Sequence, residues 1–172
     1  GISNIISIFT NSQSCVAMDG DGKLFTWGNK FYGGDMNQYH NNRRVEDTNV
    51  SNITNIINIY NTSRAFAAVD SSYNVTCWGD VSYGADMTIP KDINNVYKIV
   101  STNSAFAAIY SDDYRVASWG DSKYGGDMSD LSDINNISDI YSTLGAFAAI
   151  DNSGNVHTWG DKNMGGDKHL SL

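Results

Sequence analysis

The repeating unit of this chain reads AFAAIDNSGNVHTWGDKNMGGD at residues 146–167, and three earlier segments match it. Its Trp-Gly pair recurs, and each copy runs into a tail that ends Gly-Gly-Asp or Gly-Ala-Asp; the tryptophans are Trp27, Trp78, Trp119 and Trp159. Their spacings are 51, 41 and 40 residues (78−27, 119−78 and 159−119). A fixed period in this range is the signature of a repeat architecture.

Each repeat is predicted to contain three short strands. In the last repeat the apolar residues Ile134, Ile137 and Ile140 come first, followed by the run Ala146–Ile150 and then by Val156–Trp159. An Asn-Ser-Gly turn separates the last two runs, which is a hairpin signal. The middle run is apolar on both faces, whereas a sheet with one wet face alternates apolar and polar residues. We therefore expect an all-β repeat fold, a propeller-like arc of four short three-stranded blades that pack on one another.

The period also predicts the domain organisation. The whole chain, residues 1–172, is expected to form one repeat domain. Its repeats are predicted at about 1–36, 50–87, 92–128 and 133–167, with an inserted loop at about 37–48.

The repeat resembles that of the regulator of chromosome condensation family. The matching elements are the strand Ala146–Ile150, the turn Ser153-Gly154, the strand Val156–Gly160 and the tail Asp161–Asp167. The short period is most similar to the three-stranded blades of the type II beta-lactamase inhibitor protein. Two departures stand out: the tails read Gly-Gly-Asp where the family more often has Gly-Gln, and the first repeat has Ser-Cys-Val-Ala from Ser14 in place of Ala-Phe-Ala-Ala.

The number of repeats is unusual for that family. Family propellers usually close with seven blades, which at this period would need roughly 280 residues. Four repeats are therefore expected to be part of a larger ring, an open arc, a protomer that closes with another copy, or an unusual small ring. An uncovered end blade would expose apolar sheet surface and favour association.

Composition narrows the classes of partner. The formal charge is −8, from 11 basic and 19 acidic residues. A chain this acidic repels phosphate backbones and anionic membranes, so we expect neither nucleic acid nor a membrane as partner. No cofactor is expected. Cys15 and Cys77 occupy different slots in their repeats, and two buried free thiols are the expected state. The sequence leaves the cellular compartment open.

Acidic residues recur in equivalent slots. Asp80, Asp121 and Asp161 follow Trp-Gly, and Asp86, Asp127 and Asp167 end the tails. Stacked repeats would align them along a rim, where carboxylates could bind Ca²⁺. The favoured interpretation is that they accept hydrogen bonds from backbone N–H groups in turns. No metal site is therefore predicted, and these six residues remain the alternative.

One connection is irregular. Seventeen residues separate Met36 from Ile53, whereas six separate Met87 from Ile93 in the next repeat. Insertions in repeat proteins map to loops on one face and often bind partners. This insertion holds Tyr39, His40, Arg43 and Arg44. Tyr and Arg are favoured at interface hot spots, so these four are the candidate contacts. A solvated excursion without a partner is the alternative.

The sequence offers no enzyme constellation. It contains no phosphate loop, dinucleotide fingerprint or nucleophile elbow. His157 is expected to be a rim or packing residue. The leading hypothesis is a non-enzymatic module of a larger propeller protein that binds a protein partner through one rim and the inserted loop. The alternatives are a structural unit that self-associates into a ring or filament, and, as the family resemblance implies, a regulator similar to a guanine-nucleotide exchange factor.

Overall fold

The computed structural model describes residues 2–36, 53–86, 94–131 and 134–167. These residues form four antiparallel three-stranded sheets in which the strands pair in chain order. The strands are β1 (Ile5–Thr10), β2 (Ser14–Asp19), β3 (Leu24–Gly28), β4 (Ile56–Asn61), β5 (Ala65–Asp70), β6 (Val75–Gly79), β7 (Val96–Ser101), β8 (Ala105–Tyr110), β9 (Val116–Gly120), β10 (Ile137–Ser142), β11 (Ala146–Asp151) and β12 (Val156–Gly160). The predicted all-β arc of three-stranded blades is confirmed.

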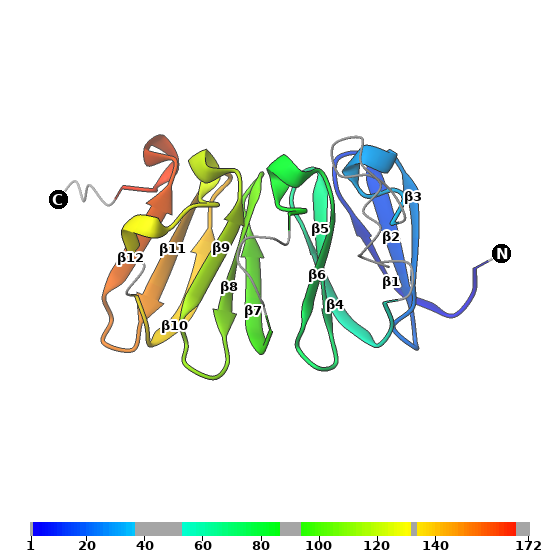
Figure 1. The fold of residues 1–172 in the computed structure, drawn as a ribbon, viewed down its shortest axis with the longest axis horizontal. Helices are drawn as coiled ribbons and strands as arrows, with labels where there is room; N and C mark the ends of the chain where they lie inside the picture. Colours follow the sequence, from blue (N-terminus) through cyan, green and yellow to red (C-terminus); the bar gives the residue numbers. More distant parts are fainter. Residues whose placement is uncertain (1, 37–52, 87–93, 132–133, 168–172) are drawn as a thin grey trace.

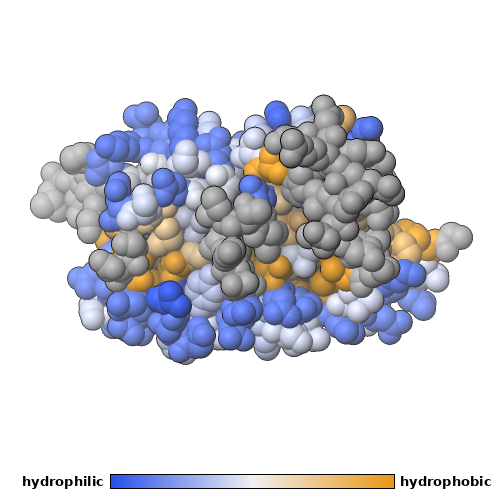
Figure 2. All heavy atoms as spheres, in the orientation of Figure 1, coloured by the Kyte–Doolittle hydropathy of each residue, from blue (hydrophilic) through white to orange (hydrophobic). Residues whose placement is uncertain are grey.

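The four blades stand side by side in one open row, with the two termini at opposite ends (Figure 1). The first strands of successive blades contact each other, from β1 to β4, β7 and β10. One long edge carries short 3₁₀ helices, and the other carries the hairpin turns (Figure 1). The helices on that edge are η1 (Lys30–Tyr32), η3 (Val81–Tyr83), η4 (Ser122–Tyr124) and η6 (Lys162–Met164), and a further one, η5 (Ser129–Leu131), lies in the connection from the third blade to the fourth. On the face drawn in Figure 2, hydrophobic side chains gather in a band between two hydrophilic edges.

The middle strand of an inner blade packs on two neighbours at once. In β8, Ala105, Ala107 and Ile109 pack against the fourth blade. The alternate residues Phe106 and Ala108 pack against the second blade. All five side chains are fully buried. Because successive strand residues point to opposite faces, an apolar run without alternation is what a blade with two neighbours needs.

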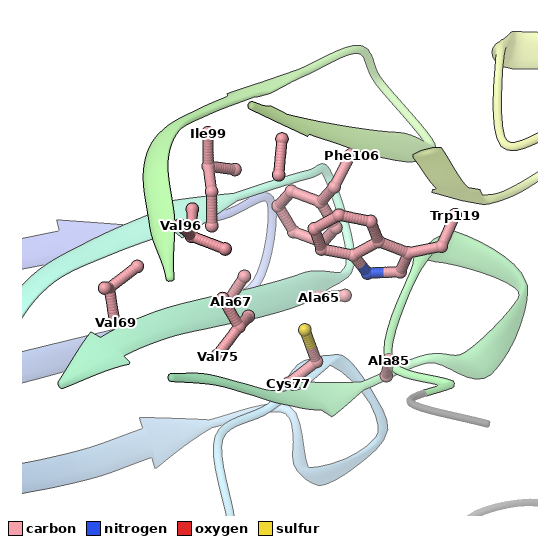
Figure 3. Packing of buried hydrophobic residues seen from close by; sticks show 11 residues of the cluster. Ala65, Ala67, Val69, Val75, Cys77, Ala85, Val96, Ile99, Phe106 and Trp119 are labelled. Carbon is pink, nitrogen blue, oxygen red and sulfur yellow. The ribbon is translucent and has the colours of Figure 1, made fainter. Parts of the chain in front are cut away.

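Each joint between blades is organised around a tryptophan. Trp119 stacks on Phe106 of its own blade with ring centroids 5.4 Å apart. Its indole N–H donates to the carbonyl of Gly84 in the preceding blade, at 3.0 Å (Figure 3 shows the packing). Trp78 and Trp159 repeat this bond to Gly33 and Gly125, at 3.1 and 3.0 Å. A tryptophan suits this place because it buries a large ring and satisfies its one donor.

The glycine in each joint is required by geometry. Gly84 has φ +100°, in the left-handed region, and a Cβ there would lie 2.6 Å from the Phe106 ring. Gly33 and Gly125 have the same conformation and meet Phe66 and Phe147 at 2.7 and 2.6 Å. Only glycine combines this backbone conformation with so close an approach.

Two backbone hydrogen bonds complete every joint. Near the helical edge, the N–H of Ser63 donates to the carbonyl of Asn103 in the next blade, at 2.9 Å. Near the hairpin edge, the N–H of Val96 donates to the carbonyl of Tyr73 in the preceding blade, at 3.1 Å. Equivalent pairs join the first blade to the second and the third to the fourth. The joint is therefore a recurring unit with three directed hydrogen bonds.

The two cysteines differ in environment. Cys77 is a free, buried thiol, as expected, and burial raises its pKa to about 12. Cys15 is also free, but it is only half-buried, so the expectation of a second buried thiol is wrong. The register pairs Cys15 with Trp27, the slot in which other blades pair Phe with Trp. That slot points away from the second blade, and in the described residues no blade covers it.

Candidate protein-binding rim

The edge that carries the 3₁₀ helices, called the helical rim below, is built by the segment after each Trp-Gly pair. In the third blade Asp121 caps η4, and its carboxylate accepts from the backbone N–H of Lys123. The helix ends at Gly125, whose left-handed conformation turns the chain back into the joint. Asx caps and a glycine after the last turn satisfy the polar groups of such short helices. The rim is therefore fixed relative to the joints below it.

The recurring Asp residues take part in this capping. Asp80, Asp121 and Asp161 accept from the backbone N–H groups of Ser82, Lys123 and Asn163, at 2.9 to 3.0 Å. In the first blade Asn29 takes the same role. These bonds are the ones that the turn interpretation predicts.

Asp127 is held in a similar way at the end of its tail. It accepts from the N–H of Ser129, and this bond lowers the pKa of Asp127. Asp86 and Asp167 end the equivalent tails of the second and fourth blades and are exposed. Within the described residues, no three His, Cys, Asp or Glu side chains lie close enough together to hold a metal ion.

The third position of each rim helix carries a large side chain. Tyr32, Tyr83 and Tyr124 occupy it in the first three blades, and Met164 occupies it in the fourth. A polar side chain between the first and second strands of the blade holds the backbone at this position. Thr62 donates to the carbonyl of Tyr83 at 2.9 Å, and Thr102 to that of Tyr124 at 3.0 Å. The tyrosines are therefore held in a row along the rim.

Arg64 lies between two of these tyrosines. Its guanidinium is 4.8 Å from the centroid of Tyr32 and 4.5 Å from that of Tyr83. Asp80 approaches it to 3.8 Å, and 39% of the Arg64 side chain is exposed. The backbone carbonyl of Arg64 accepts a hydrogen bond from the N–H of the residue that caps the rim helix. In the three other blades the residues at this position are Gln13, Ser104 and Gly145. Within the described residues, the cluster of Arg64, Tyr32 and Tyr83 occurs only at the first joint.

The sequence analysis did not single out this cluster, although a signal was present. Aligning the repeats puts an arginine where the other copies have small or neutral residues. What the alignment could not reveal is that the tyrosine of the preceding blade reaches the same guanidinium, because that contact crosses a joint. The predicted contacts Tyr39, His40, Arg43 and Arg44 lie outside the described residues.

The same side of the molecule has a hollow near its C-terminal end. The hollow has a volume of about 310 Å³ and lies between the segment around η5 and the end of β12. Asp127, Ser129, Asp130 and Lys162 are among its lining residues. Its mixed polar lining suits the seating of a partner side chain rather than the enclosure of an apolar ligand.

His157 lies on the opposite edge, in β12. Its Nε2 is 3.2 Å from the carboxylate of Asp151, the first residue of the hairpin turn. Bonds from the side chain and backbone of Asn155, and then from His157, hold the pKa of Asp151 well below its usual value. His157 therefore supports a turn, which agrees with its predicted role at a rim.

Comparison of the chain with known proteins adds information on the fold. No family model matches the sequence, and no curated protein matches it. Among solved structures, Prp20p of Saccharomyces cerevisiae superimposes with a TM-score of 0.59 at 15% identity, over 93% of this chain and 46% of that one. Human WBSCR16 gives 0.56 at 16% identity over 94% and 48%. The ectodomain of the receptor kinase CR4 from Physcomitrella patens gives 0.56 at 16% over 91% and 40%.

Fold and rim together define an all-β repeat protein of the propeller class, with its blades in an open arc. More narrowly, its blades have the fold of RCC1-type repeats, as the similarity to yeast RCC1 (Prp20) shows. The chain spans less than half the length of these solved structures. The described residues include no helix long and apolar enough to cross a membrane.

Proposed function

We infer that this chain is a non-catalytic module that binds a protein partner through the helical rim. The observation that carries this proposal is the guanidinium of Arg64, held between Tyr32 and Tyr83 and still partly open to solvent. Arg and Tyr are the residue types most enriched where binding energy concentrates in protein interfaces.

The cluster is suited to binding because it is ordered before a partner arrives. Two cation–π contacts and the nearby Asp80 restrict the rotamers of Arg64. Immobilising a free arginine on binding costs roughly 0.5–1.5 kcal/mol, and preorganisation reduces that cost. Asp80 lies at 3.8 Å from the Arg64 side chain, longer than a direct hydrogen bond, so guanidinium donors remain for a partner's carboxylate or carbonyl.

The inserted loop extends the proposed surface. The described chain stops at Met36, shortly after Tyr32 of the rim, and the insertion follows directly. We therefore keep Tyr39, His40, Arg43 and Arg44 as proposed contacts in addition to Arg64. Arg43, Arg44 and Arg64 are basic residues in an acidic protein, so a surface that includes them would favour an acidic patch on the partner.

One solved relative of this fold supports the class of activity. Prp20p is described with binding properties toward Gsp1p and histones, and yeast RCC1 was solved in complex with Kap60. A propeller with blades of this fold can therefore bind proteins. At 15% identity the similarity extends to the fold alone, so the proposed partner of this chain depends on the residues of its own rim.

The test compares two arginines on opposite edges. Immobilised wild-type protein is used to capture partners from a cell extract, and affinity for each purified partner is then measured. Arg64→Ala should weaken binding about tenfold, an effect of roughly 1.4 kcal/mol. Arg115→Ala removes the same charge from an exposed hairpin turn and should leave binding unchanged.

Two results separate the rim from the loop. If Arg64→Ala and Arg115→Ala bind equally well, the rim is not the binding surface. The triple variant with Tyr39, Arg43 and Arg44 changed to Ala should also weaken capture at unaltered melting temperature. Unchanged capture by that variant would remove the loop from the proposed surface.

A further inference from the structure

The first blade exposes one half of a blade joint. Its outward surface, called the leading face below, carries Ile8, Cys15 and Trp27. Ile8 is 61% exposed and Trp27 is 44% exposed, whereas the equivalent Ile99 and Trp119 in the third blade are 2% and 1% exposed. The registers align these residues, because Ile8 pairs with Ala17 as Ile99 pairs with Ala108. The leading face therefore has the chemistry of the surfaces that are buried in every internal joint.

The fourth blade exposes the other half. Its outward surface, called the trailing face below, carries Tyr141, Ala148, Val156 and Gly165. Tyr141 is 60% exposed and Val156 is 43% exposed. The equivalent Val100 and Val116 of the third blade pack into the next joint. Among the described residues, a Cβ on Gly165 would meet nothing closer than Thr143 at 3.9 Å, and no aromatic ring lies against it.

The hydrogen-bonding groups on the two faces are complementary. The leading face presents the indole N–H of Trp27, the backbone N–H of Ile5 and the carbonyl of Ser12. The equivalent groups of the other blades form the hydrogen bonds across the internal joints. The trailing face offers the matching carbonyl groups of Gly165 and Gly154 and the N–H of Leu144. Gly154 also has open space beside it, where the equivalent Gly22 meets the backbone of Ile56 at 2.4 Å.

We propose that the trailing face of one copy of this chain docks on the leading face of a second copy and rebuilds the blade joint between them. The indole of Trp27 then donates to the carbonyl of Gly165 in the second copy. A head-to-tail contact of this kind joins different surfaces, so it produces a closed ring or a longer array, depending on the rotation between copies. The occupant is a second copy because each face of this chain matches the other across all three hydrogen-bonding slots. The end of η6 borders this contact, as η4 borders β12 in the third internal joint, whereas Arg64, Tyr32 and Tyr83 lie at the first internal joint and take no part in it.

At Cys15 the joint between copies differs from every internal joint. Cys15 stands where the internal joints have a phenylalanine that stacks on the tryptophan and covers the joint glycine. The smaller side chain leaves part of that volume unfilled, which weakens the contact. Cys15→Phe should therefore tighten association, because it restores the aromatic pair.

The first experiment measures mass against concentration by light scattering and sedimentation. Wild-type protein should associate as its concentration rises. Trp27→Ala should weaken this association about thirtyfold, as expected for a central aromatic anchor. Phe31→Ala removes a similarly exposed ring from the helical rim and should change nothing. A wild-type protein that stays monomeric at high concentration overturns the proposal, provided that Cys15→Phe is monomeric as well.

The second experiment tests the head-to-tail arrangement. Trp27→Ala blocks the leading face, and Ala148→Arg places a long side chain on the trailing face. Each variant alone should remain monomeric, while a mixture of the two should form a dimer through the intact pair of faces. Failure of the mixture to dimerise under conditions where wild type associates would contradict the head-to-tail contact. A rim variant such as Arg64→Ala should associate normally, which separates this proposal from the proposed function.

Discussion

The internal joints and the two outer faces of this arc are made of equivalent residues in different surroundings. Trp119 and Trp27 hold the same slot, yet one is buried against the preceding blade and the other is exposed. Gly125 and Gly165 both end a rim helix in the left-handed region, yet only Gly125 lies against a phenylalanine ring. The difference shows that a blade supplies half of each joint, and that the neighbouring blade decides what each residue contributes.

The largest expected effect is the loss of a buried joint tryptophan. Trp119→Ala should lower the free energy of unfolding by about 3–5 kcal/mol, because it removes a buried ring and the bond to Gly84 and leaves a cavity. Trp27→Ala should lower it by less than about 1 kcal/mol in the monomer, where that ring is partly solvated. Urea denaturation at low protein concentration measures both. Equal losses would show that the outer face is already covered.

The joint glycines offer a comparison at constant backbone conformation. Gly125→Ala and Gly165→Ala both place a Cβ at positive φ, which costs roughly 1–2 kcal/mol. At Gly125 the new Cβ would also lie 2.6 Å from the Phe147 ring, which adds roughly 1–3 kcal/mol of overpacking. The melting temperature of Gly125→Ala should therefore be well below that of Gly165→Ala. The same melting temperature for both would mean that the joint relaxes around the methyl group.

Two threonines below the rim make the same pair of hydrogen bonds in different blades, so their variants compare the effect of burial on these bonds. Thr102 accepts from the N–H of Ala105 and donates to Tyr124, and Thr143 makes the same two bonds to Ala146 and Met164. Thr102 is buried, whereas Thr143 is exposed. Thr102→Val should cost about 1–3 kcal/mol, because it leaves buried polar groups without partners. Thr143→Val should cost less, since water reaches the same groups; chemical denaturation of both variants checks this.

The smallest expected effect is electrostatic. The ammonium of Lys98 reaches across the third joint to Asp139 and lowers the pKa of that carboxyl. A lowered folded-state pKa means that the contribution to stability is complete above 3.8, the usual pKa, and is lost as the pH falls through the folded value. Both side chains are one-third exposed, so the pair should contribute less than about 1 kcal/mol.

The matched variants for this pair are Lys98→Met and Arg115→Met. Lys98→Met should reduce the loss of stability in acid, measured as melting temperature against pH, because Asp139 then loses its partner. Arg115 pairs with Asp113 inside one exposed turn, so Arg115→Met changes a contact that spans no joint. If Arg115→Met changed the pH dependence of the melting temperature more than Lys98→Met did, the ion pair across the joint would not stabilise blade packing more than a pair within one turn does.

Much of the fold could be predicted because each blade is a local unit. Apolar runs, hairpin turns and the Trp-Gly end are all encoded within about forty residues, and four copies agree. The unbroken apolar run from Ala105 to Ile109 indicated that both faces are covered. The third hairpin shows the limit of this alignment. Tyr110 stands there in the slot of Asp70 and Asp151, and its turn is one residue longer than theirs.

The candidate site was less accessible to sequence reasoning. The insertion attracted attention because it breaks the period, and its residues remain proposals. The cluster around Arg64 depends on Tyr32, which belongs to the preceding blade. The state of Cys15 was mispredicted for a related reason: its slot is buried in other blades only because a neighbour covers it.

The sequence by itself determined the blade: its three strands, the apolar residues on both faces of its middle strand, the Asp residues that accept hydrogen bonds in its turns, and its glycine tails. These features follow from local propensities and from the side-chain alternation of a strand. Only the tertiary structure decided how one blade meets the next, since the bonds from Trp78, Trp119 and Trp159 to a glycine carbonyl span 34 to 45 residues. The same packing leaves the equivalent surfaces of the first and fourth blades exposed, because in the described residues neither blade has a neighbour on that side.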